Sequence, residues 1–153
     1  ANPQSADPVE RISSRVSSVA CSAAQTFNDP EMVLKYIGGS RERPHPSTFG
    51  FFGVQSLMEL DLPEKRQMAY EASAINFVSP DDPPLFLLYG GDLTPTPLPE
   101  SAEEGVRIHH PRFGEMLKEK YDALGLECHL YYKSKPAPPG ARLAFVKKHF
   151  GMQ

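Results

Sequence analysis

The sequence has no tryptophan, only two cysteines and no long apolar run. A helix that spans a bilayer needs about 20 apolar residues, and no stretch approaches that length, so no membrane span is expected. Cys21 and Cys128 each lie in an apolar segment, which favours buried free thiols over a disulfide and leaves the cellular compartment undetermined. The formal net charge of −3 provides no broad attraction to nucleic acid, which is therefore not expected as a partner.

Three patterns that would indicate specific chemistry are also missing. The five histidines and two cysteines show none of the spacings that hold zinc. No glycine-rich loop of the phosphate-binding type occurs, and no Gly-x-Ser-x-Gly nucleophile elbow occurs. The sequence therefore predicts no metal and no cofactor.

The composition otherwise fits one globular domain that covers residues 1–153. Hydrophobic residues make up 40% of the chain and charged residues 23%, as in ordinary globular proteins, and the length suffices for one hydrophobic core. The 16 prolines are unusually many. Because aromatic residues are interleaved with them, they indicate ordered connections rather than disorder.

The segment 83–92 provides the strongest structural signal. Two prolines precede five large apolar or aromatic residues, and Gly90, Gly91 and Asp92 follow them. A short apolar run bounded by turn formers predicts a strand buried on both faces, which is typical of parallel sheets covered by helices. Functional residues in such sheets follow the carboxyl ends of the strands, so Asp92 is a candidate site residue. A turn or helix-capping role is its structural alternative.

The rest of the chain alternates strands with helices. Further strands are expected at 15–24 and 126–132, and helices at 29–37, 63–73, 110–124 and 142–150. This alternation predicts an α/β fold of three αβα layers, with a small parallel sheet of about three strands. Residues 38–62 show little periodicity, which indicates either a lid-like binding loop or a surface insertion anchored by its phenylalanines.

Residues 72–90 read ASAINFVSPDDPPLFLLYG, a turn followed by the predicted central strand. This segment resembles the α/β-hydrolase esterase/lipase family, most closely its carboxylesterase and feruloyl-esterase-like branch. Residues 7–16 resemble the lead into the family's sixth strand, and residues 110–128 resemble its penultimate helix and final strand. Together with the alternation, this resemblance implies that the three predicted strands lie in chain order in the sheet. The resemblance covers nearly the whole chain but only the C-terminal half of the family's fold, and it implies a relationship to serine hydrolases of carboxylic esters.

The family's catalytic residues match this sequence poorly. The position of the catalytic acid holds Leu93, with Asp92 one residue early, so Asp92 is a displaced candidate acid. The loop 134–141, where the family places its histidine, contains none, and His149 lies in the last predicted helix. His109 and His110, at a helix start near the strand ends, are the alternative bases. Acyl transfer needs a nucleophile within hydrogen-bond reach of its base, so the 153 residues alone do not supply the family's triad.

Three functions therefore remain open. The chain is an esterase-like relative that is inactive alone, or a carboxylic-ester hydrolase completed by a complementary N-terminal half, or a non-enzymatic module that binds or assembles through features such as the aromatic loop 38–62. The predicted strand at 15–24 would leave one edge unpaired, and such edges invite pairing with another chain. We expect a homo-oligomer or a complex with a complementary hydrolase half, unless residues 1–10 cover this edge.

Overall fold

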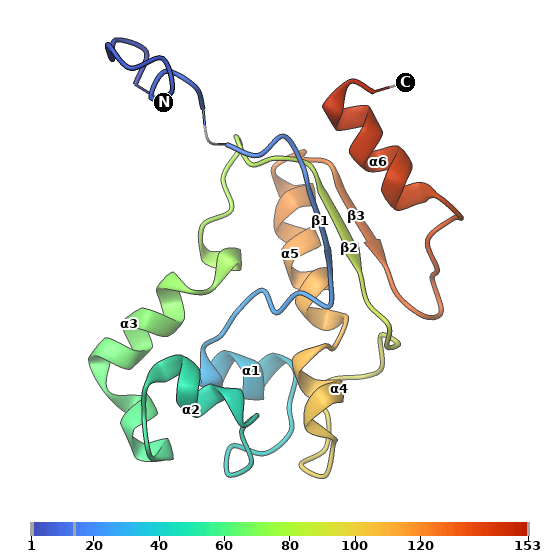
Figure 1. Ribbon diagram of the computed structural model, residues 1–153. Coiled ribbons are helices and arrows are strands. Elements are labelled where there is room, and N and C mark those ends of the chain that lie inside the picture. The colour runs from blue at the N-terminus through green and yellow to red at the C-terminus, as the bar shows by residue number, and fades with distance from the viewer. Residues whose placement is uncertain (1, 14, 153) are drawn as a thin grey trace.

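The computed structural model describes residues 2–13 and 15–152, and a three-stranded parallel sheet lies at its centre (Figure 1). The strands are β1 (Val19–Ser22), β2 (Leu85–Leu88) and β3 (Cys128–Tyr131), in the order β1-β2-β3. Val19 is paired with Leu85, and Leu85 with Cys128. The predicted α/β class, parallel direction and strand order are confirmed. β1 is shorter than the expected 15–24 at both ends, and Ala23, with a φ of 53°, turns the chain out of the sheet.

The four predicted helices are present, the first three with shorter bounds and the last beginning one residue earlier than expected. They are α1 (Pro30–Tyr36), α3 (Pro63–Glu71), α5 (Arg112–Ala123) and α6 (Ala141–Phe150). The start of α1 follows from its sequence, because the Asp29 carboxylate accepts the N–H groups of Glu31 and Met32 and Pro30 occupies the first turn. Gly38, with a φ of 94°, follows the helix in a conformation that favours glycine.

The two faces of the sheet are covered by different helices, which makes the predicted three layers. Side chains of alternate strand residues point to opposite faces. Leu87 and Leu130 belong to the same buried cluster as Phe113 and Leu117 of α5. On the opposite face, the ring of Phe86 lies 5.5 Å from the ring of Phe145 in α6. Figure 1 shows the sheet between these two helices.

Residues 38–62 are not the irregular segment that the sequence indicated. They contain α2 (Ser47–Phe52) and the 3₁₀ helix η1 (Leu57–Asp61), which pack with α3 around a second small core of Phe52, Val54, Leu60 and Ala69. Two other short helical elements, η2 (Ala74–Asn76) and α4 (Glu104–Ile108), also lie in stretches without a clear pattern. Elements this short fall below the window over which helical periodicity is recognised.

The N-terminal segment lies away from the sheet. Figure 1 shows its turns beyond the amino end of β1, so the described residues 2–10 do not cover the edge of that strand. An ion pair between Arg15 and Asp81 joins the end of this segment, just before β1, to the turn before β2. Within residues 2–13 and 15–152, no helix combines the length and the apolar character needed to cross a membrane.

Candidate functional site

Asp92 lies at the carboxyl edge of the sheet, just after β2. Its Oδ1 accepts the backbone N–H of Ser134 at 2.7 Å, and the neighbouring Gly91 carbonyl accepts the N–H of Lys133 at 3.0 Å. The hydrogen bond from Ser134, helped by the charge of Lys133, lowers the pKa of Asp92. Asp92 therefore fastens the loop after β2 to the loop after β3. Among the described residues, its carboxylate accepts no N–H from the residues just after it, as a simple cap would, although its backbone carbonyl accepts that of Thr94 at 2.9 Å.

His110 is buried, with 2% of its surface exposed, and both of its ring nitrogens are engaged. Nδ1 accepts the backbone N–H of Arg112 at 3.1 Å, so the ring proton lies on Nε2, which donates to Thr94 Oγ1 at 3.0 Å. Burial lowers the pKa of His110 and keeps the ring neutral. The ring thus completes the start of α5 and anchors the segment that follows β2.

His109 is exposed, and its ring contacts the chain next to β1 rather than the segment after β2. Its Nδ1 lies 3.2 Å from the carbonyl oxygen of Ala23, so Nδ1 carries the ring proton and donates a hydrogen bond to that carbonyl, just after the end of β1. Among the hydrogen bonds of the described chain, none joins Asp92, His109 or His110 to another of the three. The structure brings these candidates to the same end of the sheet without assembling them into a relay.

One serine hydroxyl does contact a histidine. Ser47 Oγ lies 2.5 Å from His45 Nδ1, and the same Nδ1 accepts the Ser47 backbone N–H at 3.2 Å. Two bonds between residues two positions apart are typical of a local turn, here at the start of α2. In the part of the chain that the structure describes, no carboxylate is bonded to the His45 ring, so the third member of a triad is missing there.

A cavity of about 230 Å³ lies between α1, α2, η1 and α4. Its apolar wall comes from Val33 and Leu34 of α1, Phe51 and Phe52 of α2 and Leu60 of η1. His45, Ser47, Arg41 and Arg107 also border it. The aromatic segment 38–62, interpreted from sequence as a lid-like binding loop or an anchored insertion, thus forms much of the wall of a cavity.

Arg107 is the residue of this cavity that sequence reasoning missed. It belongs to α4, is 5% exposed, and donates through Nη1 to the Ser40 carbonyl at 3.0 Å and through Nη2 to the Arg43 carbonyl. Its Nε has no hydrogen-bond partner among the residues described. Gly39 makes this approach possible, because a Cβ at that position would lie 2.0 Å from Arg107 Cδ. The only signal was the pair Gly38-Gly39, which also ends α1.

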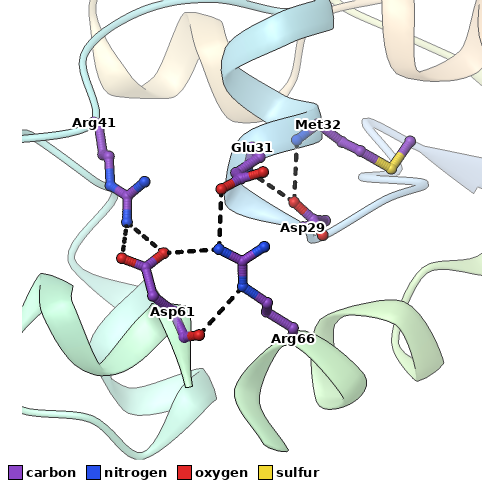
Figure 2. A network of polar contacts seen from close by, with 6 residues as sticks. All are labelled: Asp29, Glu31, Met32, Arg41, Asp61 and Arg66. Carbon is purple, nitrogen blue, oxygen red and sulfur yellow. Dashed lines mark hydrogen bonds and ion pairs between the residues drawn. The ribbon is translucent and has the colours of Figure 1, made fainter. Parts of the chain in front are cut away.

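A network of four charged side chains holds one side of the cavity together (Figure 2). Asp61 at the end of η1 accepts from Arg41 at 2.6 Å and from Arg66 of α3 at 3.4 Å. Arg66 also donates to Glu31 of α1 at 3.1 Å. The hydrogen bond from Arg41 lowers the pKa of Asp61. The network joins α1, η1 and α3, and its two positive and two negative charges balance.

Another titratable cluster lies at the opposite, amino end of β3. Glu127 contacts Lys148 at 2.8 Å and His129 at 2.8 Å, and these bonds, that of Lys148 first, lower the pKa of Glu127 to about 2. His149 lies 3.4 Å from the same carboxylate. The cluster attaches α6 to the sheet. Within residues 2–13 and 15–152, no group of three histidine, cysteine or acidic residues is arranged to hold a metal ion.

Comparison of the chain with protein-family models, with curated proteins and with solved structures gives no match.

Proposed function

We propose that this chain is a diverged relative of the α/β-hydrolase esterases and lipases whose 153 residues do not hydrolyse esters alone. The resemblance of residues 72–90 motivates the relationship. The parallel order β1-β2-β3, with α5 and α6 on opposite faces, agrees with the last three strands that this resemblance implies. Fold alone does not carry a function, so the proposal depends on the site.

The separation of the candidate catalytic side chains supports the loss of activity. Asp92 is bonded to the Ser134 backbone, and His110 uses both ring nitrogens for Thr94 and Arg112. A general base must be able to reach the proton that it removes, and the neutral, fully bonded ring of His110 lacks that freedom. Among the described residues, no carboxylate orients the His45 ring that contacts Ser47. This contact therefore stabilises a local turn and does not form a catalytic triad.

Hydrolysis of p-nitrophenyl acetate and butyrate by the purified chain tests this proposal. The expected rate equals that of buffer, and Ser47→Ala and Asp92→Asn leave it unchanged. A rate above buffer that disappears in either variant would show a working ester-hydrolysing site and would contradict the proposal.

The open edge of β1 favours assembly as the role of the chain. Val19 and Ala23 donate their N–H groups to Pro84 and Leu88 of the neighbouring segment. Because successive N–H groups along a strand alternate in direction, those of Ala20 and Ser22 point away from β2. On that side, one hydrogen bond from the described chain reaches β1, from Arg142 Nη2 to the Ala20 carbonyl at 3.1 Å. One arginine contact covers only part of the edge of β1, so a strand of another chain can still pair with it.

We therefore propose that β1 pairs with a strand of a second copy, and that a complementary N-terminal hydrolase half is the competing partner. Sedimentation equilibrium at micromolar concentration is expected to give twice the 17.0 kDa mass of one chain. Ser22→Pro removes an outward N–H at an edge position where proline is tolerated, and is expected to give the single-chain mass. Ser22→Val, which keeps the N–H, is the matched control. A wild-type chain that stays at 17.0 kDa would contradict pairing of two copies.

A further inference from the structure

We propose that the cavity between α1, α2, η1 and α4 binds a small amphipathic monocarboxylate. The carboxylate lies toward Arg107, and the apolar body lies among Phe51, Phe52 and Leu60. This inference concerns a different part of the molecule from the edge of the sheet. The binding of a carboxylate in this cavity does not depend on the proposed relationship to esterases.

The buried positive charge of Arg107 favours binding of an anion in the cavity. A buried charge is costly unless it is paired, and a guanidinium stays protonated at all ordinary pH values. Arg107 has only the carbonyls of Ser40 and Arg43 as partners, and no carboxylate lies within ion-pair distance of it in the described chain. Its positive charge is therefore solvated by dipoles but not neutralised, which favours an anion nearby.

The rest of the lining supports a single negative charge on the ligand. Among the residues that border the cavity, none is an aspartate or a glutamate. Arg41 also borders it, but Asp61 already neutralises that guanidinium at 2.6 Å. One uncompensated guanidinium matches one carboxylate, and a guanidinium presents its N–H groups in a geometry that suits a carboxylate.

The apolar wall determines the other end of the ligand. Binding cavities for small molecules are mostly apolar with a few polar groups that fix orientation. Phe52 and Leu60 are buried, whereas Phe51 remains 45% exposed although it borders the cavity. A ligand with an alkyl or aromatic body would cover part of this exposed ring. The volume of about 230 Å³ restricts that body to a short chain or a single ring.

Contacts within the chain hold the groups that line the cavity in place. Gly39 permits the close approach of Arg107, and two hydrogen bonds to Ser40 and Arg43 hold the guanidinium in place. Arg66 of α3 contacts both Asp61 of η1 and Glu31 of α1, and these contacts fix the three elements relative to one another (Figure 2). Because these groups need no ordering on binding, the interaction energy is not spent on ordering them.

Calorimetric titration of the full chain with octanoate and with octanamide, its neutral analogue, tests the inference. Octanoate is expected to bind about tenfold or more tightly than octanamide, since hydrogen bonds that involve a charged group are the stronger ones. Leu34→Trp, which places a larger side chain against the cavity, is expected to abolish binding of octanoate while the circular dichroism spectrum and Tm are retained. Amide shifts in ¹H–¹⁵N NMR spectra should be confined to α1, α2, η1 and α4.

Two charge variants complete the design. Arg107→Gln is expected to reduce the preference for octanoate over octanamide to about one, whereas Arg11→Gln, which removes an equal charge from the exposed N-terminal segment, is expected to leave it unchanged. Equal affinities for the two ligands in the wild-type chain, octanoate binding that survives Leu34→Trp, or no binding of octanoate at millimolar concentration would each overturn the inference. If Arg107→Gln does not fold, the ratio of the affinities of the wild-type chain for octanoate and octanamide, together with octanoate binding by Leu34→Trp, still tests the inference.

Discussion

Gly114 of α5 is where the helix approaches the sheet most closely. A Cβ at this position would lie 2.5 Å from Tyr89 Cε2 and 2.8 Å from Leu130 Cδ1. Alanine in place of glycine normally stabilises a helix by about 1 kcal/mol. Overpacking of a well-filled core costs about 1–3 kcal/mol. The clash involves an aromatic ring held in the core, so we expect Gly114→Ala to lower the free energy of unfolding in urea by about 1–2 kcal/mol.

Gly105 of α4 provides the matched control. No atom lies within 4 Å of the Cβ that alanine would add there. Gly105→Ala is therefore expected to keep the free energy of unfolding or raise it by up to about 1 kcal/mol. A Gly114→Ala protein that is stabilised as much as the control would show that α5 does not contact Tyr89 and Leu130 as described.

His110 makes stability depend on pH. Its pKa is lowered in the folded chain by burial, so the folded state favours the neutral ring. The contribution is present in full above the unfolded value of about 6.5 and is lost as the pH falls through the lower folded value. We expect the free energy of unfolding in urea to decrease between about pH 7.5 and about pH 5.5.

The variant His110→Asn separates this titration from the other acidic and basic groups. The asparagine oxygen can still accept the N–H of Arg112, and the side chain does not titrate. We expect a lower stability at neutral pH, because the bond to Thr94 is lost, and a flatter dependence on pH. If the slope of the variant equals that of the wild type, His110 is not the group responsible.

Sequence reasoning at the residue scale found one location well and missed another. The Gly-Gly-Asp after an apolar run placed Asp92 at the carboxyl edge of the sheet, where the structure has it. The partner of Asp92, a backbone N–H of Ser134, lies 42 positions away and has no signature in the side-chain sequence. Arg107 was missed for the same reason, since its partners are carbonyl groups.

At the scale of elements, the position of β1 at the edge of the sheet predicts which of its backbone amides exchange slowly. Cys21 lies in register with Leu87, and its N–H is expected to point to β2, whereas those of Ala20 and Ser22 point away. In an unpaired chain, amide exchange should be slow at Cys21 and fast at Ala20 and Ser22. Pairing of β1 with a second strand should slow exchange at Ala20 and Ser22 as concentration rises.

The Ser22→Pro protein is the control for that measurement, since it should not pair. Its Ala20 amide is expected to exchange rapidly at every concentration. Slow exchange of Ala20 in this variant, or fast exchange of Cys21 in the wild-type chain, would show that β1 does not have the pairing and free edge described.

The elements that could be predicted are those with a strong local pattern. Residues 85–89 are five consecutive apolar residues, and β2 is buried because both faces of the sheet are covered. α5 shows apolar side chains at helical spacing and was expected within two residues of its observed ends. α2 and η1, of six and five residues, depend on tertiary packing of Phe52 and Leu60, which no local pattern reveals.

At the scale of the whole molecule, the alternation of strands and helices predicted a parallel sheet, because parallel strands must be joined by crossovers. The order of the strands was predicted from this alternation together with the resemblance to the hydrolase family. The cavity could not be predicted in this way. Its walls come from Leu34, Phe51 and Arg107, which are distant in sequence and meet only when α1, α2 and α4 pack together. The open edge of β1 was anticipated, whereas the contact of Arg142 with Ala20 was not.

Labelling with a fluorophosphonate, followed by intact-mass spectrometry, tests most directly the claim that these residues contain no working serine-hydrolase site. The reagent reacts with a serine hydroxyl only when a base activates it. The account predicts an unmodified chain of 17.0 kDa after exposure to excess probe, with Ser47→Ala giving the same result. Stoichiometric labelling of the wild-type chain, at Ser47 or at any other serine, would contradict it.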